Sequence, residues 1–264
     1  MPELPEVEAA AIIARRTLVG RRLVAVTTHH AAQRRSLPPR HGARLAGLRI
    51  AAVERRGKSQ LVHFSDGAVL LVHFRMNGDW EVVAEGAPAP AYTRVAFATD
   101  DGVRLCLVDP RALCTATYHA PGKPPRITLG PEPDQLTVTA LRAALARRAG
   151  PIKPVLLDQK VVAGLGNIYA AEALWRARID PRTPARDLSA PQLAALVKGI
   201  KAAIADGFAR QGRYRAGTAG TAGTRAHAFK VYDREGLPCR RGCGAIARIT
   251  QAGRSTYFCP TCQE

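Results

Sequence analysis

Four of the six cysteines form two close pairs near the C-terminus of this 264-residue chain. Cys239 and Cys243 make the first pair, and Cys259 and Cys262 make the second, about 20 residues further on. Two thiolate pairs at this spacing predict a tetrahedral zinc site on a β-hairpin. Four protein ligands leave no open coordination position, so we expect one structural zinc ion rather than a catalytic one.

The chain carries a large excess of positive charge, with 39 Lys and Arg against 21 Asp and Glu, a net charge of +18. Such a balance is typical of a protein surface that follows nucleic-acid phosphates. An anionic membrane would also attract it, but no apolar run is long enough to span a bilayer and no amphipathic anchor stands out. We therefore expect a nucleic acid as the partner and no membrane association.

The N-terminal residues are acidic where a secretory signal peptide would be basic, so no signal peptide is predicted. The remaining cysteines, Cys106 and Cys114, stand apart in apolar surroundings and are predicted to be buried thiols. These features predict a reducing compartment that contains nucleic acid.

Hydrophobic periodicity changes once along the chain. Residues 6–19 are predicted to form a helix that Gly20 ends, and short branched-rich runs from 22 to 118 predict a β-sandwich or flattened barrel. A proline-rich stretch at 119–133 is predicted to be a linker.

Residues 134–232 have helical periodicity, with a capping box at Ser189 opening the strongest helix. A thrice-repeated Ala-Gly-Thr tract at 216–224 is expected to be mobile. With the cysteine hairpin assigned to 233–264, the sequence predicts a multidomain α+β protein: an N-terminal β domain (1–118), a helical domain and a zinc hairpin.

The N-terminus carries the residues with the most specific chemistry. If Met1 is removed, Pro2 becomes a secondary amine followed closely by Glu3 and Glu6. An α-amino group titrates near pH 8 against about 10.4 for lysine, so much more of it is a neutral nucleophile at pH 7. Proline and glutamate also suit the first turn of a helix, which is the alternative interpretation of this segment.

Several motifs together resemble one family. The N-terminal Met-Pro-Glu-Leu-Pro-Glu-Val-Glu, the segment 151–175 and the cysteine hairpin are similar to the formamidopyrimidine-DNA glycosylase and endonuclease VIII family. The resemblance covers essentially the whole chain from Pro2 to Cys262. It implies a helix–two-turn–helix within the helical domain and a bifunctional DNA glycosylase and abasic-site lyase that uses Pro2 as nucleophile and Glu3 as acid and base. It also implies that Glu6 orients the N-terminus or relays protons.

The resemblance also assigns DNA contacts, residue by residue. Lys58 matches a β-strand lysine that lies near the extruded nucleotide, and we expect Lys58 to be one of the catalytic residues. Arg111 would face the orphaned base, and Leu113 stands where an aromatic wedge is usual. The remaining matched positions are expected to contact DNA: His73, Met76, Lys153, Asn167, Tyr232 and Arg254.

Two positions depart from the family pattern. Leucine at 113 fills space but stacks poorly, so DNA kinking or the search for lesions is expected to differ from the family pattern. Three residues separate Cys239 from Cys243, where two are usual, so this knuckle is expected to be distorted rather than lost.

We expect a monomeric enzyme acting on duplex DNA that contains oxidised bases or abasic sites, and we favour oxidised purines. The alternatives are a glycosylase for oxidised pyrimidines, a lesion-binding module without catalysis, and a basic RNA-associated protein. Trapping with borohydride and competition between damaged DNA and structured RNA would separate them.

Overall fold

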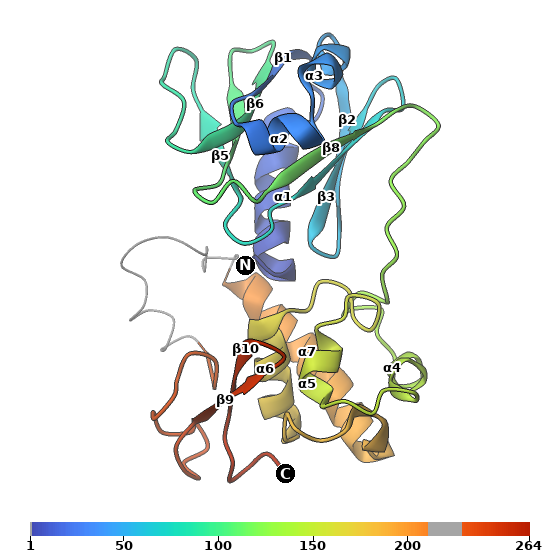
Figure 1. The fold of residues 1–264 in the computed structure, drawn as a ribbon, viewed down its shortest axis with the longest axis vertical. Coiled ribbons are helices and arrows are strands. Elements are labelled where there is room, and N and C mark those ends of the chain that lie inside the picture. Colours follow the sequence, from blue (N-terminus) through green and yellow to red (C-terminus); the bar gives the residue numbers. More distant parts are fainter. Residues whose placement is uncertain (1, 211–228) are drawn as a thin grey trace. The chain divides into compact units, whose positions relative to one another are not determined.

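The computed structural model describes residues 2–210 and 229–264, and its described residues form two compact units (Figure 1). Residues 2–127 make the first unit, and residues 128–210 with 229–264 make the second. The division falls inside the predicted 119–133 linker, while the other predicted domain limits stay predictions. The repeated tract at 216–224 lies outside the described residues.

The first unit is a sandwich of two antiparallel four-stranded sheets, as expected. One sheet has the order β1 (Leu23–Thr28), β6 (Thr93–Thr99), β7 (Arg104–Val108), β5 (Asp79–Val83), and the other has the order β2 (Ile50–Arg56), β3 (Ser59–Phe64), β4 (Val69–His73), β8 (Thr115–His119). Their inner faces share one apolar core, in which Trp80 packs edge-to-face on Phe74 and Phe97. The sequence did not predict β5 and β8, which are five-residue strands of mixed polar and apolar residues that pair at the edges of the two sheets.

Helix α1 (Leu4–Leu18) begins two residues earlier than the predicted helix, because Pro5 lies inside its first turn. It contacts β2 and β3 of one sheet and β5 and β7 of the other. Its direction opposes that of β2: Arg15 donates to the Val53 carbonyl at 2.8 Å, and Arg55 pairs with Glu8 at 2.6 Å. The start of α1 therefore lies toward the end of β2.

Two short helices, α2 (Ala31–Ser36) and α3 (Pro39–Leu45), follow β1 where the sequence predicted only β structure. Six and seven residues are too few for a helical period to stand out in the sequence. Both helices contact β1, and α2 also contacts β8.

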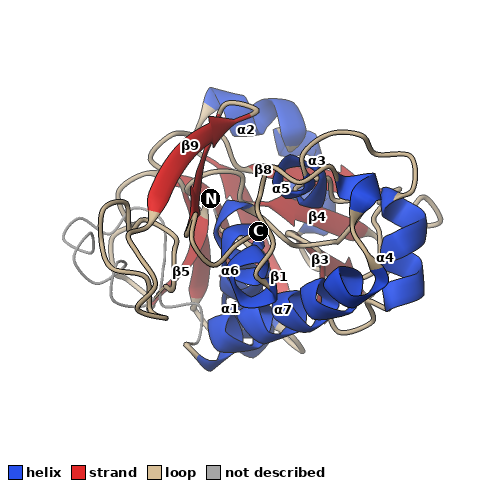
Figure 2. Cartoon of the chain, turned by 90° about the horizontal axis from the view of Figure 1, so that it is seen from below, coloured by secondary structure: helices blue, strands red, loops and turns tan. Residues whose placement is uncertain are grey.

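The second unit contains α4 (Val138–Leu145), α5 (Ile152–Leu156), α6 (Asn167–Ala177), a 3-10 turn (Ala185–Asp187) and α7 (Ala190–Ala209), drawn in blue in Figure 2. The predicted capping box is present: Ser189 N–H donates to Gln192 Oε1 at 2.9 Å, and Ser189 Oγ accepts from Gln192 N–H. Helix α7 packs closely on α6, since a Cβ at Gly199 would lie 2.6 Å from the Ala173 carbonyl. None of the helices in the described ranges combines the length and apolar character that a bilayer crossing requires.

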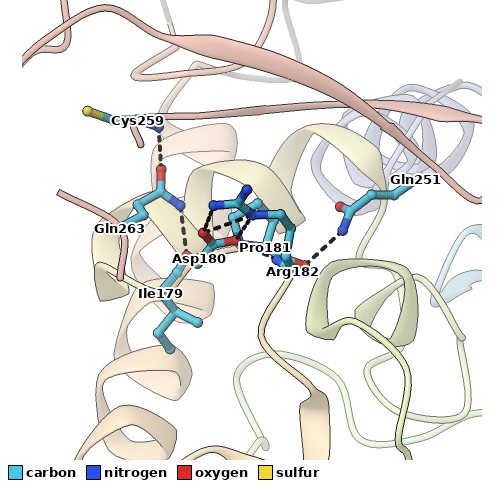
Figure 3. Close-up of polar contacts among 7 residues, drawn as sticks. All are labelled: Ile179, Asp180, Pro181, Arg182, Gln251, Cys259 and Gln263. Atoms are coloured by element: carbon cyan, nitrogen blue, oxygen red, sulfur yellow. Dashed lines mark hydrogen bonds and ion pairs between the residues drawn. The ribbon is translucent and has the colours of Figure 1, made fainter. Parts of the chain in front are cut away.

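The hairpin of β9 (Ala247–Gln251) and β10 (Arg254–Phe258) is fastened to the loop that follows α6 (Figure 3). Gln263 accepts from the Cys259 N–H and donates to the Ile179 carbonyl, both at 2.9 Å. Gln251 donates to the Pro181 carbonyl at 3.1 Å. These side-chain bonds hold the hairpin on the helices of its own unit.

Candidate active site and nucleic-acid interface

The strand register of the second sheet brings three predicted site segments to one end. Ser59 pairs with His73, and His73 pairs with Thr115, so these residues form one row across β3, β4 and β8. The residue before Ser59 is Lys58, the residues after His73 lead to Met76, and the loop before Thr115 carries Arg111 and Leu113. All three segments therefore leave the sheet at the same end.

The start of α1 lies at this same end. Because α1 runs against β2, its residues approach the β2–β3 turn as the numbering falls from Arg15 through Glu8 to Glu3. Figure 1 shows the start of α1 and the turn between β2 and β3 on the same side of the first unit. The fold thus brings Pro2, Glu3 and Glu6 toward the other predicted contacts of this unit.

Pro2, Glu3 and Glu6 are all buried, and the two carboxylates belong to the capping box of α1. The backbone N–H of Glu3 donates to Glu6 Oε2 at 2.9 Å. This bond fixes the peptide immediately after Pro2. The structure confirms the helix-start interpretation of the segment, and it places Pro2 directly before that start.

Lys58 lies in the turn between β2 and β3, and not on a strand as the resemblance implies. Its side chain is 8% exposed, which is unusual for lysine. His73 lies close enough for the Lys58 charge to lower the pKa of the imidazole.

His73 is a neutral imidazole at pH 7. Burial is the main cause that lowers its pKa to about 4, and the charges of Arg75 and Lys58 lower it further. Its Nδ1 accepts a hydrogen bond from the Arg75 N–H at 2.9 Å. The proton of the neutral ring is therefore on Nε2, which can donate to an anion without carrying charge.

Met76 is at the tip of the turn between β4 and β5 and is 40% exposed. Arg75 adopts a positive φ of 56°, and Gly78 approaches the Phe74 backbone so closely that a Cβ would lie 2.7 Å from its carbonyl oxygen. The turn is tight for these reasons, and it presents an unbranched apolar side chain to solvent.

The loop that carries Arg111 and Leu113 is organised by the buried carboxylate of Asp109. That carboxylate accepts from the N–H groups of Arg111 at 3.0 Å and of Leu113 and Cys114 at 2.7 Å each. Arg111 is exposed and Leu113 is 42% exposed. Burial is the main cause that raises the pKa of Cys114 to about 12, which agrees with the prediction of an inert buried thiol.

In the second unit, the turns between α5 and α6 are held by Gln159. Its side chain donates to the carbonyls of Leu157 and Leu165 and accepts from the Gly164 N–H, at 2.9–3.0 Å. Gly164 has a φ of +79°, a conformation that favours glycine. The turns lead into α6, whose first N–H groups suit an anion.

Asn167 is the first residue of α6, and Gly166 is its N-cap. The Asn167 amide donates to the Ser255 carbonyl at 3.0 Å and accepts from the Lys153 ammonium. Lys153 is fully buried and also donates to the Ser255 carbonyl at 3.2 Å. These contacts place Arg254, exposed at the start of β10, beside the helix start.

Tyr232 is half-buried and packs edge-to-face on Phe229 and Tyr257. Its backbone N–H donates to the buried carboxylate of Glu172 at 3.1 Å, as does that of Val231 at 2.9 Å. Glu172 on α6 therefore fixes the backbone at Tyr232.

The four predicted zinc ligands converge, with all sulfur atoms within 4.8 Å of one another. Cys239 Sγ lies 3.9 Å from Cys262 Sγ, and Cys243 Sγ lies 3.5 Å from Cys259 Sγ. Zn–S bonds of about 2.3 Å in a tetrahedron require sulfur separations of about 3.8 Å, so the site fits one structural zinc ion. The longer first knuckle keeps Cys243 in the cluster, and the positive φ of Gly242 (74°) and Gly244 (151°) accommodates it.

Sequence reasoning missed the side chains that hold these segments. Asp109 and Glu172 lie within recognised motifs, but nothing in their spacing shows that their carboxylates bind backbone N–H groups of a loop. Gln33, on a helix that was not predicted, donates to the loop of Arg111 from the other side. The partners of Gln33 and Glu172 lie 58 to 81 residues away in the sequence and become visible only in the folded chain, whereas those of Asp109 lie 2 to 5 residues away.

Family models match three parts of the chain. The formamidopyrimidine-DNA glycosylase N-terminal domain matches residues 1–116, the H2TH domain of the same enzyme matches 129–216, and the zinc finger found in FPG and IleRS matches 236–264. The matches follow the order that the motifs predicted.

Relatives and solved structures agree along the full length. The formamidopyrimidine-DNA glycosylase of Paracoccus denitrificans is 40% identical over all of both chains, and that of Chloroflexus aggregans is 43% identical over 100% of this chain and 98% of its own. Lactococcus lactis Fpg in complex with DNA containing N7-benzyl-Fapy-dG superposes with a TM-score of 0.88 at 28% identity, covering 100% of both chains. MutM in complex with carbocyclic 8-oxo-G DNA superposes with a TM-score of 0.85 at 29% identity, again over 100% of both. The chain belongs to the formamidopyrimidine-DNA glycosylase family.

Proposed function

We propose that this protein is a base-excision-repair glycosylase and abasic-site lyase that removes oxidised purines from duplex DNA through an iminium on Pro2. The observation that carries the proposal is the common position of the α1 start, the Lys58 turn, the Met76 turn and the Arg111 loop at one end of the first unit. This common position supports the proposal, because it brings the segment of Pro2, Glu3 and Glu6 toward the DNA contacts proposed for the first unit.

The Pro2 nitrogen attacks C1′ of the damaged nucleotide, and the C1′–N bond to the base breaks with its electron pair going to the base. The departing base takes up the proton that the Pro2 nitrogen releases. Glu3 donates a proton to the sugar ring oxygen as the ring opens to the iminium. The iminium then accepts electrons as a proton leaves C2′ and the 3′ phosphate departs, followed by the 5′ phosphate. A one-nucleotide gap remains, and the chain needs no redox cofactor.

Oxidised purines are favoured because Arg111, whose backbone N–H is held by Asp109, is exposed and matches the family residue that would face an orphaned base. Its guanidinium can donate to the acceptors of cytosine but would meet a donor on adenine. The structural zinc site and Lys153 hold the phosphate-binding side chains of the second unit. A DNA substrate and bacterial relatives support a place at the nucleoid.

Borohydride trapping on abasic-site DNA tests the mechanism. Wild-type protein should become covalently attached to the DNA, and Pro2→Gly or a blocked terminus should cut the yield sharply, with Pro5→Ala as the matched control. Equal trapping by the blocked protein would exclude the Pro2 iminium. Binding of lesions without any trapping would instead favour a non-catalytic lesion-binding module.

Excision from a panel of lesion duplexes tests the substrate. Oxidised guanine opposite cytosine should be cut faster than oxidised pyrimidines. The reverse order would favour the endonuclease VIII type of specificity.

A further inference from the structure

We propose that Gln33 is a positioning residue for the loop of Arg111 and Leu113, and that it holds Leu113 in the orientation that fills the space left by an extruded nucleotide. The inference rests on the proposed function, because it concerns the extrusion step of that reaction. Gln33 touches neither the substrate nor the predicted nucleophile, and it acts through the loop backbone.

The contacts of Gln33 surround Leu113. Gln33 lies on α2 and is 1% exposed. Its Nε2 donates to the Ala112 carbonyl at 3.1 Å and to the Cys114 carbonyl at 2.7 Å. These two carbonyls belong to the residues on either side of Leu113, so one amide grips the chain before and after the wedge residue.

Asp109 completes this grip from the N–H side. Its Oδ2 accepts from the N–H groups of Leu113 and Cys114, while Gln33 takes carbonyls of the same short stretch. Ala112, the residue before Leu113, has a φ of 53°, a left-handed conformation that non-glycine residues avoid. A strained residue of this kind persists only where the surrounding structure holds it.

The Gln33 amide is not a simple filler of the core. Its Oε1 is buried and has no hydrogen-bond partner among the described residues. A buried acceptor without a partner destabilises the fold, and an apolar side chain of similar length would avoid that cost. The amide instead contributes two donated hydrogen bonds that fix the geometry of the loop.

This geometry matters because Leu113 lacks an aromatic ring. A leucine wedge cannot stack on the neighbouring base pairs, so it can only occupy the vacancy by shape. A leucine wedge, which fills the vacancy by shape, therefore depends more strongly on a preorganised backbone than an aromatic wedge does, because the aromatic ring can also stack. Gln33 supplies that preorganisation from a helix outside the site.

The test compares Gln33→Met with Gln60→Met. Gln60 is also 1% exposed in the first unit, bonds Trp80 at 2.8 Å through its Oε1, and leaves its Nε2 without a partner among the described residues. Methionine keeps the length of glutamine and removes its donors. Gln33→Leu is the second variant if Gln33→Met fails to fold.

Single-turnover excision of oxidised guanine opposite cytosine should fall about tenfold more in Gln33→Met than in Gln60→Met, because loss of the loop bonds makes wedge insertion less favourable by about as much as one net hydrogen bond contributes. Cleavage at a preformed abasic site should change less, because no damaged base has to be expelled. An equal effect of the two substitutions, at equal thermal stability, would overturn the inference.

A double-mutant cycle separates positioning from general stability. If Gln33 acts through Leu113, Gln33→Met should have little further effect once Leu113→Ala has removed the wedge. Full additivity of the two substitutions would show that Gln33 does not work through Leu113.

Wedge insertion can also be followed without catalysis, by the fluorescence of 2-aminopurine placed opposite a tetrahydrofuran site. Wild-type binding should raise the fluorescence, and Gln33→Met should lower that rise while Gln60→Met does not. Wild-type protein that inserts its wedge but excises no lesion contradicts the proposed function alone. Active protein with unchanged fluorescence in Gln33→Met contradicts this inference alone.

Discussion

The side-chain amide of Asn167 donates to the backbone carbonyl of Ser255 at 3.0 Å, joining the start of α6 to the zinc hairpin. The buried Lys153 donates to the same carbonyl. Two predicted phosphate contacts, Asn167 and Arg254, are therefore parts of one assembly that the hairpin completes.

Arg254→Ala should weaken binding to damaged and undamaged duplex alike and lower the salt dependence of binding by about one unit, because one phosphate-neutralising charge is lost. Arg248 is the matched control. It pairs with Tyr257 across the hairpin, three positions along from the pair of Arg254 and Gln251, so its side chain lies on the opposite face of the hairpin from Arg254. There it forms an ion pair with Glu235. Binding titrations over a salt series measure both slopes. An unchanged slope for Arg254→Ala would show that this arginine does not meet phosphate.

Asn167→Ala should also weaken both kinds of duplex, but it should lower the salt slope by less than Arg254→Ala does, because the amide itself is neutral. The lost bond loosens the Ser255 backbone, so the substitution should act partly through Arg254. Titration of the Asn167→Ala/Arg254→Ala double variant should then show less than the sum of the single effects. Weakening confined to damaged DNA would instead assign Asn167 to lesion recognition.

Zinc retention should depend on Arg241. This guanidinium lies 3.9 Å above the Trp175 ring and donates to Cys262 Sγ at 3.1 Å, while Trp175 Nε1 donates to Cys239 Sγ at 3.4 Å. Four thiolates around Zn²⁺ carry two net negative charges, which such donors offset. Release of zinc to a chromophoric chelator should be faster in Arg241→Gln than in the neighbouring Arg240→Gln. Equal release rates would contradict an outer-shell role for Arg241.

Stability should fall in mild acid partly because of His73. Its folded pKa of about 4 lies below the ordinary value of 6.5, and burial is the first cause. Between these values the unfolded chain binds more protons than the folded one, so this contribution is present above pH 6.5 and is lost as the pH falls toward 4. Urea unfolding from pH 7 to 4 should show a smaller acid loss in His73→Gln. Parallel curves for the two proteins would contradict a half-buried, neutral imidazole at His73.

Arg111 should set the preference for the opposite base. Wild-type protein should excise an oxidised purine faster opposite cytosine than opposite adenine, and Arg111→Ala should reduce that ratio more than it lowers abasic-site cleavage. The loss of one bidentate base contact corresponds to about 1–3 kcal/mol of discrimination. A ratio that survives the substitution would assign the preference to another residue.

The sequence alone determined the chemistry and most elements of this protein. The cysteine spacing, the amine of Pro2 and the 151–175 segment are local patterns, in which residues near in sequence supply the ligands, nucleophile or turn. Branched-rich runs likewise identified six strands, since a strand that faces a core needs the same residue types wherever it pairs.

Only the tertiary structure decided how these parts are held. The row of Ser59, His73 and Thr115 follows from strand pairing, which a list of strands does not contain. The burial of Lys153 and the hydrogen bonds of Gln33 to the loop of Leu113 depend on partners between 14 and 102 residues away. A side chain's hydrogen-bond partner is set by the packing of whole elements, and no periodicity in the sequence encodes it.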